Sequence, residues 1–278
     1  MKNDNKSSGT NKYSIVVSDF DDTLLRSDGT ISEFTKQTVS DFVARGGTFL
    51  IATGRMTRSA LAEARRLGLK GQVISYQGGM INDIESGETL FHSPIPAEGA
   101  AFNLARMEEH EGQVHAYIDD VLYVRRNNDY TREYERALGV LAVETHVPLS
   151  QYVSERGATP TKLLMIAHAE IVRELVTELT EKHGDEFYYC MSKPVFFEVT
   201  KAGVNKGEAV AMTAEKMGKT MSDVLAVGDS LNDLPMIERA GLGCAVANAL
   251  PEVLQKARVT GESNDDDGVA KLILKYGI

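Results

Sequence analysis

Carboxylates gather where the first apolar run of the chain ends. The stretch VVSDFDDTLL places Asp19, Asp21 and Asp22 almost side by side directly after an apolar segment. Like charges this close repel one another, and the end of a strand is partly shielded from water, so each carboxylate resists ionisation. Such a cluster is tolerable where it binds a cation.

A second acidic pair follows a later apolar run. Asp229 and Asp233 are four residues apart where a strand gives way to a helix, so one helical turn puts both side chains on the same side. Carboxylate oxygens suit Mg²⁺, which takes one or two of them and completes its octahedron with water and substrate phosphate. We therefore expect a magnesium site built from Asp19, Asp21, Asp229 and Asp233, and no catalytic role for Asp22.

Two further segments offer groups that bind phosphate. Thr53-Gly54-Arg55 lies between a strand and a helix, where a hydroxyl, free backbone N–H groups and the helix dipole form an anion site. Lys206, at the start of a late helix, offers a compact positive charge for a phosphate oxygen or for a nucleophilic carboxylate. Metal, hydroxyl, amide and ammonium together describe phosphoryl transfer, in which positioning and charge neutralisation do the work.

The elements that must position these residues alternate along the chain. Apolar runs predict strands at 14–18, 48–52, 72–75, 224–227 and 243–247, and helical spacing predicts helices at 32–45, 57–67, 206–217, 233–240 and 251–257. This alternation predicts an α/β fold, a Rossmann-like wound parallel sheet. Ligands bind such sheets beyond the carboxyl ends of the strands, which is where the polar clusters fall.

The middle of the chain has a different pattern. Two hairpins are indicated, HAYIDDVLYV turning at Asp119-Asp120 and FYYCMSKPVFFEV turning at Ser192-Lys193-Pro194, with helices at 97–111 and 170–183 and a strand at 162–167. We predict a polar tail at 1–13, a core formed by 14–84 and 198–278, and an inserted α+β cap at 85–197, with hinges at 82–90 and 201–207. Five cap residues are candidates for substrate contact, although each alone is more often a solvated or core residue: His115, Arg125, Arg126, His146 and Lys162.

Composition narrows the class of protein. The chain has 278 residues and a formal net charge of −10, and no basic stripe suits a nucleic acid. No apolar run approaches the roughly 18 residues of a membrane span, and the first residues lack the apolar region of a secretory signal. Cys190 and Cys244 match no metal spacing and are expected as buried reduced thiols, so we expect a cytoplasmic protein.

These motifs carry a family resemblance. The sequence resembles the haloacid dehalogenase (HAD) superfamily, specifically Cof-type phosphatases with a type IIB (C2B) cap. Asp19-Phe20-Asp21-Asp22-Thr23 matches the first motif, DxDxT; Thr53-Gly54-Arg55 matches the second, and Lys206 the third. The segment from Gly228 to Asp233, GDSLND, matches the fourth.

The resemblance implies a role for each matching position. Asp19 attacks phosphorus to form an aspartyl-phosphate, and Asp21 protonates the leaving alcohol and then activates water. Thr53 and Lys206 hold phosphate oxygens. Magnesium is bound by Asp19, the backbone carbonyl of Asp21 and Asp229, with Asp233 beside it or one contact away.

The substrate side of the site is also implied by the resemblance. Gly54, Arg55, Gln77, Gly78 and Asn232 are expected to contact substrate. Gln77-Gly78-Gly79 stands where this branch has Asn-Gly-Ala, near the substrate entrance, so the specificity of a relative does not transfer directly.

The leading hypothesis is a magnesium-dependent phosphatase of small phosphorylated metabolites, most plausibly sugar phosphates, acting as a monomer or homodimer. The cap would close over the sheet and exclude bulk water. A phosphomutase acting on hexose phosphates and a non-catalytic phosphate-binding module are the alternatives. Release of free phosphate separates the first from the second, and the paired Asp19 and Asp21 argue against the third.

Overall fold

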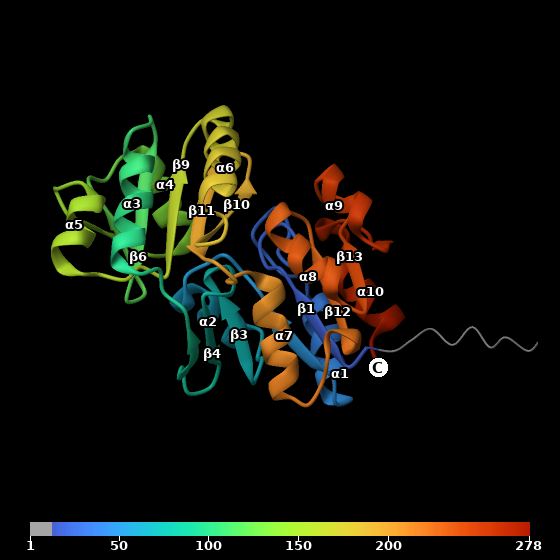
Figure 1. The fold of residues 1–278 in the computed structure, drawn as a ribbon. Coiled ribbons are helices and arrows are strands. Elements are labelled where there is room, and N and C mark those ends of the chain that lie inside the picture. The colour runs from blue at the N-terminus through green and yellow to red at the C-terminus, as the bar shows by residue number, and fades with distance from the viewer. Residues whose placement is uncertain (1–12) are drawn as a thin grey trace, which may run out of the picture.

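The computed structural model describes residues 13–278, and it confirms the α/β class (Figure 1). The expected polar tail lies outside these residues except for Tyr13, which is buried and forms a bridge with Gly277. Within the described residues, no helix is both long enough and apolar enough to cross a membrane.

A parallel sheet of five strands lies at the centre of one half of the molecule. Its spatial order is β14-β13-β12-β1-β2, and every neighbouring pair is parallel. Most of its residues are buried and apolar, as expected of strands covered on both faces. The strands are β1 (Ile15–Ser18), β2 (Thr48–Ile51), β12 (Val224–Gly228), β13 (Leu242–Ala245) and β14 (Val259–Thr260).

The direction of winding reverses between β1 and β12. The chain steps from β1 to β2 in one direction and from β12 to β13 and β14 in the other. Right-handed crossovers in opposite directions place their helices on opposite faces. Accordingly, α1 (Glu33–Ala44) packs on α10 (Gly268–Tyr276), and α7 (Lys206–Lys216) packs on α8 (Leu234–Arg239). A crevice forms at such a reversal, beyond the ends of β1 and β12.

Side-chain caps fix where two of these helices begin. The Ser32 hydroxyl accepts a hydrogen bond from the backbone N–H of Thr35 at the start of α1, and the Asn205 side chain caps α7 in the same way. Each such cap stabilises a helix by about 1 kcal/mol. The cap on α7 fixes the orientation of Lys206, its first residue. The remaining core helices are α2 (Thr57–Arg66) and α9 (Pro251–Lys256).

A small antiparallel sheet continues the core beyond β2. It consists of β3 (Gln72–Ser75), β4 (Met80–Asp83) and β5 (Thr89–His92), and β3 lies beside the end of β2 through a bridge between Ala52 and Ile74. The segment 82–90, expected as a hinge, instead contains the turn of the β4–β5 hairpin. The Asp83 carboxylate accepts hydrogen bonds from Ser86, and Gly87 takes a φ of 78°, so the turn is tight and ordered.

The other half of the molecule is a six-stranded sheet with helices, drawn in green and yellow in Figure 1. Its order is β10-β11-β9-β6-β7-β8, and both predicted hairpins are present in it. The strands are β6 (Gln113–Ile118), β7 (Val121–Val124), β8 (Ala142–Glu144), β9 (Lys162–Ile166), β10 (Phe187–Lys193) and β11 (Phe196–Lys201). The helices are α3 (Ala97–Glu108), α4 (Asp129–Leu138), α5 (Leu149–Arg156) and α6 (Ala169–His183).

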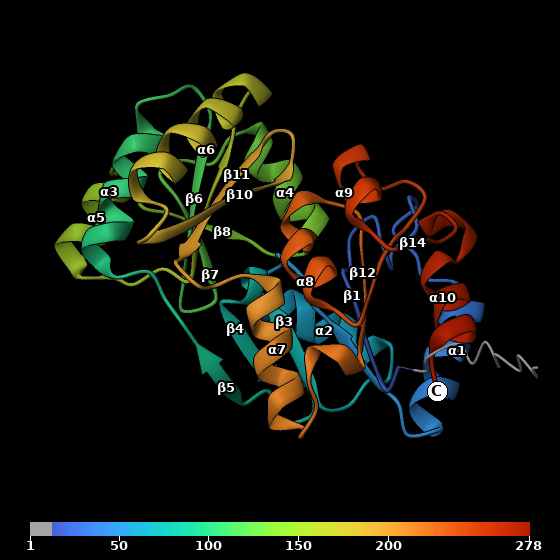
Figure 2. The same ribbon diagram turned by 45° about the vertical axis from the view of Figure 1, so that its right-hand side comes forward.

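The two faces of this sheet have different partners. Along β9, Leu163 and Met165 pack with residues of α3, α5 and α6, whereas Leu164 and Ile166 pack on the opposite face, with residues that include Tyr134 of α4. Figure 2 shows α4 on the side of the sheet that faces the core. Because side chains alternate between the faces of a strand, Lys162 shares the core-facing side with Leu164 and Ile166.

We propose the same division of the chain as the sequence indicated, with residues 85–197 inserted between the two core segments, 14–84 and 198–278. The separate apolar clusters support it, because one forms around the parallel sheet and another around the six-stranded sheet. Two strands do not follow these bounds: β5 lies within 85–197 but pairs with β4 of the core, and β11, which spans the boundary at 197/198, pairs with β9 of the cap.

Candidate active site

Asp19 lies directly beyond β1, at the crevice where the winding of the sheet reverses. Its side chain is nearly buried, and its Oδ1 accepts a hydrogen bond of 2.5 Å from the Lys206 ammonium. The side chain lines a cavity of about 160 Å³. Among the described residues, no hydrogen bond to Oδ2 is present, so one carboxylate oxygen is anchored and the other is free of protein partners.

Asp229 and Asp233 come from the neighbouring strand end, after β12. Asp229 accepts hydrogen bonds from the Thr23 and Ser230 hydroxyls, at 2.6 and 2.7 Å, which fix its orientation. Asp233 is fully buried; its Oδ1 accepts from Lys206 at 2.6 Å and its Oδ2 accepts from the backbone N–H groups of residues 229 and 230. Gly228 permits this close fold, because a Cβ there would lie 2.5 Å from the Asp233 side chain.

The three carboxylates meet the requirements of a divalent cation. One oxygen from each of Asp19, Asp229 and Asp233 lies within 4.8 Å of the others, and all three residues are buried. Lys206 alone leaves this group with a net negative charge, which is costly away from water. Hard oxygen donors of this kind fit Mg²⁺. Both oxygens of Asp229 and both of Asp233 already accept hydrogen bonds, whereas the Oδ2 of Asp19 accepts none among the described residues, so Asp19 is the best placed direct ligand.

The pKa values of these residues reflect the same cost of burying several negative charges together. Burial raises the pKa of Asp19 well above its ordinary value, and the attraction of Lys206 only partly opposes this. Burial also raises the pKa of Asp229 to about 6, with the charge of Asp233 as the next cause. Burial works against the charge of Lys206, but Asp19 and Asp233 outweigh it and raise its pKa, so the ammonium persists at neutral pH.

The second expected phosphate motif lies opposite this group. Thr53, Gly54 and Arg55 all line the same cavity as Asp19, and the Thr53 hydroxyl accepts from the backbone N–H of Arg55 at 3.1 Å. The Arg55 guanidinium does not face the cavity freely, because it donates two hydrogen bonds, of 2.6 and 2.9 Å, to the carboxylate of Asp21. This bidentate pair holds Asp21 at the edge of the cavity and away from the three clustered carboxylates.

Gln77 connects the core to the cap through a strained turn. Tyr76 and Gln77 both adopt positive φ, at 52° and 59°, which is uncommon for residues with side chains. In that conformation the Gln77 amide accepts from Asn232 at 2.9 Å and donates to Glu198 at 2.5 Å. The Asn232 Oδ1 is buried without a partner among the described residues, beside the cavity. Gly78 lies next to this turn, against the backbone carbonyl of Asn205.

The cap contributes a buried ion pair to the same cavity. Lys162 of β9 lies 3.3 Å from Glu198 of β11 and donates a 2.7 Å hydrogen bond to the Gly54 carbonyl. Ser192 donates to the same carboxylate at 2.8 Å. Burial opposes the charge of Lys162, but the attraction of Glu198 outweighs it and raises the pKa of Lys162, so its ammonium persists at neutral pH.

Of the five cap residues proposed from the sequence for substrate contact, only Lys162 lines this cavity. His115 is buried in the cap with Thr131 as its hydrogen-bond partner, His146 is exposed, and Arg125 and Arg126 line a different hollow. Besides Asp22, six further residues line the cavity that the sequence analysis did not propose for the site: Tyr134, Ser192, Lys193, Phe196, Glu198 and Ser230. Glu198 carried a signal, because a charged residue inside the apolar run Phe196–Val199 is seldom buried without a partner. The expected buried free thiols are confirmed for Cys190 and Cys244.

Comparisons with known proteins agree with this geometry. A family model for haloacid dehalogenase-like hydrolases matches residues 16–273. The HMP-PP phosphatase of Yersinia pestis is 30% identical over 245 residues, covering 88% of this chain and 87% of that protein. A crystal structure from Thermotoga maritima has a TM-score of 0.77 at 31% identity, covering 96% of this chain and 98% of that one. A HAD subclass IIB sugar phosphatase has a TM-score of 0.80 at 20% identity, covering 94% and 98%, which shows the fold alone.

Proposed function

The chain is a phosphatase that belongs to the haloacid dehalogenase-like hydrolase family, and we propose that it hydrolyses small phosphomonoesters with Mg²⁺ through a phosphoryl-aspartate at Asp19. The observation that carries this proposal is the position of Asp19. Its Oδ1 is held by Lys206, its side chain lines the cavity, and its carboxylate lies with Asp229 and Asp233 in one buried group.

The proposed mechanism assigns the steps to residues of this chain. Asp19 attacks phosphorus, and the alcohol leaves with a proton from Asp21; water, activated by Asp21, then hydrolyses the acyl phosphate. Asp19, the backbone carbonyl of Asp21 and Asp229 would hold Mg²⁺, with Asp233 acting through Lys206 and the backbone. The ion supplies charge neutralisation for the phosphoryl oxygens. Thr53 and Lys206 bind phosphate oxygens, and Lys206 also orients Asp19 and favours its ionised form.

We further propose that the alcohol of the substrate carries hydroxyl groups, as in a sugar phosphate. Glu198, Ser192 and Lys162 line the cavity beside the expected phosphate position, and together they offer a carboxylate, a hydroxyl and an ammonium for hydrogen bonds. Gln77, Gly78 and Asn232 would support that wall of the site. The buried reduced cysteines support a cytoplasmic setting.

A phosphate-release assay tests the proposal. The parent protein is expected to release inorganic phosphate from phosphorylated metabolites with Mg²⁺, and to lose that activity in EDTA. Asp19→Asn and Asp21→Asn are expected to abolish turnover, and Asp229→Ala to raise the Mg²⁺ concentration needed for half-maximal rate. Asp41→Asn, at an exposed carboxylate of α1, is the control and is expected to match the parent. Full activity of Asp19→Asn would contradict the proposed nucleophile, and interconversion of hexose phosphates without phosphate release would favour a mutase.

A further inference from the structure

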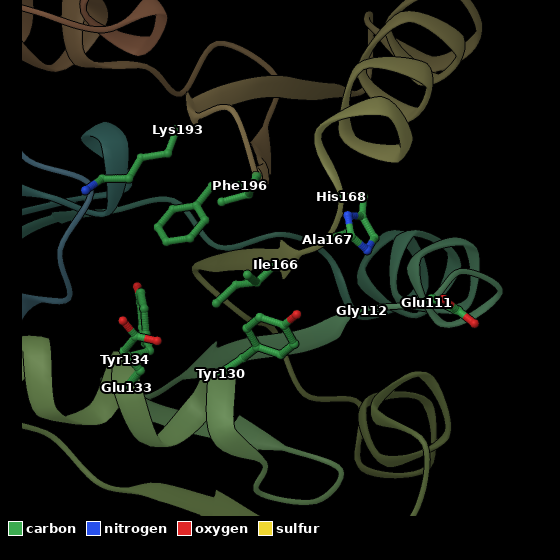
Figure 3. A pocket seen from close by; sticks show the side chains of 11 residues that line it. Glu111, Gly112, Tyr130, Glu133, Tyr134, Ile166, Ala167, His168, Lys193 and Phe196 are labelled. Carbon is green, nitrogen blue, oxygen red and sulfur yellow. The ribbon is translucent and has the colours of Figure 1, made fainter.

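A second, larger cavity lies in the cap. Its volume is about 550 Å³, and its walls come from α4, the end of β9 and the β10–β11 hairpin. Figure 3 shows Ile166 and Phe196 around the same space as Tyr130, which lies on one helix with Glu133 and Tyr134. The lining residues are Glu111, Gly112, Tyr130, Glu133, Tyr134, Ile166, Ala167, His168, Lys193, Val195 and Phe196.

The cap cavity adjoins the cavity that contains Asp19. Tyr134, Lys193 and Phe196 line both of them. The cavity at Asp19 is only about 160 Å³, below the roughly 300–1,000 Å³ usual for small-molecule sites, and the phosphoryl group and the ion must share it. Space for the rest of a substrate is therefore found across the shared wall, in the cap.

The wall between the cavities has a movable part. The Lys193 side chain is half exposed, and its ammonium lies 3.3 Å from the Asp22 carboxylate on the core. Exposed ion pairs of this kind contribute little energy, about 0–1 kcal/mol, so the side chain can shift at small cost. Tyr134 and Phe196, the other two shared residues, present aromatic surface to both sides.

The chemistry of the cap cavity selects against negative charge. Three aromatic rings, Tyr130, Tyr134 and Phe196, face it together with the aliphatic side chains of Ile166 and Val195. Its charged groups are two carboxylates, Glu111 and Glu133, against one ammonium that is already paired with Asp22. An anionic group would be repelled there, whereas a flat uncharged ring can stack on the aromatic side chains.

No contact within the described residues explains why residue 130, which lines the cavity, is aromatic. Its side chain is 56% exposed on α4, and among the described residues it takes part in no hydrogen bond, aromatic pair or cation–π contact. A large apolar side chain left this exposed is informative when it lines a cavity, because ligand sites are lined mainly by apolar and aromatic groups.

We propose that the preferred substrate is a sugar phosphate whose sugar carries an uncharged aromatic ring, and that this ring occupies the cap cavity against Tyr130 and Phe196. The inference rests on the proposed phosphatase function. The sugar hydroxyls then lie beside Glu198 and Ser192, and the ring lies beyond Tyr134 in the cap. Tyr130 is thereby a specificity-determining residue that takes no part in the reaction itself.

A matched pair of substrates tests the inference. Ribose 5-phosphate and adenosine 5′-monophosphate present the same primary phosphoester, and only the second carries an aromatic ring on the sugar. We expect kcat/KM to be at least about tenfold higher for adenosine 5′-monophosphate, mainly through a lower KM, because ring stacking and apolar burial add to binding. Equal or lower kcat/KM for that compound would overturn the inference while leaving the phosphatase proposal intact.

Variants locate the preference in the cap cavity. Tyr130→Ala is expected to remove most of the preference by raising KM for adenosine 5′-monophosphate, with kcat/KM for ribose 5-phosphate unchanged; Tyr130→Phe is expected to retain it. Leu141→Ala, at an 83% exposed cap residue outside the cavity, is the control and is expected to match the parent on both compounds. Equal losses on both compounds in Tyr130→Ala would contradict a specificity role.

Binding without turnover separates the two proposals. Titration calorimetry of both compounds into Asp19→Asn with Mg²⁺ measures recognition when hydrolysis is absent. If neither compound is hydrolysed by the parent, the phosphatase proposal fails for this substrate class, but tighter binding of adenosine 5′-monophosphate, lost in an Asp19→Asn/Tyr130→Ala protein, would still support the ring site. Equal binding of the two compounds would overturn it.

Discussion

At the scale of single residues, the pair between Arg55 and Asp21 sets the position of the proposed acid and base. Two parallel hydrogen bonds fix the plane of the Asp21 carboxylate, and the guanidinium also lies 4.7 Å from the centre of the Phe20 ring. A lysine offers the same charge but no planar fork. We therefore propose that Arg55, expected from the sequence as a substrate ligand, positions Asp21.

We predict that Arg55→Lys lowers kcat by about 100-fold with a much smaller change in KM, because a carboxylate displaced by about 1 Å transfers its proton poorly. Steady-state kinetics on one phosphomonoester measure both constants. Arg66→Lys, on the exposed side of α2, is the matched control and should match the parent. A change confined to KM would instead assign Arg55 to substrate binding.

At the scale of elements, β6 carries a buried histidine on its core-facing side. His115 is fully buried, its Nε2 lies 3.2 Å from the Thr131 hydroxyl, and its ring packs against Tyr134. Burial, and then the charge of Lys162, lowers the pKa of His115 to about 3. The folded protein therefore holds this imidazole neutral at pH values where an unfolded chain would protonate it.

The lowered pKa predicts acid sensitivity of the fold. At about pH 7.5 and above, His115 is neutral in both the folded and the unfolded state, and its contribution to stability is complete. As the pH falls toward 3, the unfolded state binds a proton that the folded state does not, and stability is lost. Between about pH 7.5 and about pH 5 the loss amounts to about 2 kcal/mol. Urea unfolding at both pH values should show that His115→Gln loses about this much less than the parent. His146→Gln, at an exposed histidine, should behave like the parent.

The elements of the core were largely predictable, because each has a recognisable pattern in its own stretch of sequence. The apolar runs gave β1, β2, β3 and β12 to within a residue, and the polar residues after them marked the site. The sequence analysis overlooked α4 although its ends are signalled, by Asn128 as the N-cap and Gly139 in the left-handed region. The pairing of Lys162 with Glu198 could not be predicted from the sequence. It depends on the register of β9 against β11, which no local pattern specifies.

At the scale of the whole molecule, that same ion pair joins the cap to the core. Lys162 binds Glu198 within the cap sheet and the Gly54 carbonyl in the core, and Glu198 binds Gln77, which in turn binds Asn232. The chain of contacts is buried throughout, so each member depends on its neighbours for its hydrogen bonds.

We predict that Lys162→Met lowers the free energy of unfolding by about 3–5 kcal/mol, because Glu198 remains buried without its counter-ion. Urea denaturation measures the loss. Lys193→Met removes the half-exposed ion pair with Asp22 of the core and should cost less than about 1 kcal/mol. The double substitution Lys162→Met/Glu198→Gln should recover part of the loss, and a Lys162→Met protein as stable as the parent would contradict the argument.

The pairing of β1 with β12 has a consequence for how the protein is made. On the ribosome, β1 is synthesised before the six-stranded sheet, and its neighbour β12 only after that entire sheet. The six-stranded sheet can thus fold while the edge of β1 is still unpaired. Unpaired strand edges of this kind make partly folded chains prone to aggregate. Nascent chains that end before Val224 should accordingly bind chaperones, and chains that extend past Thr260 should no longer bind them.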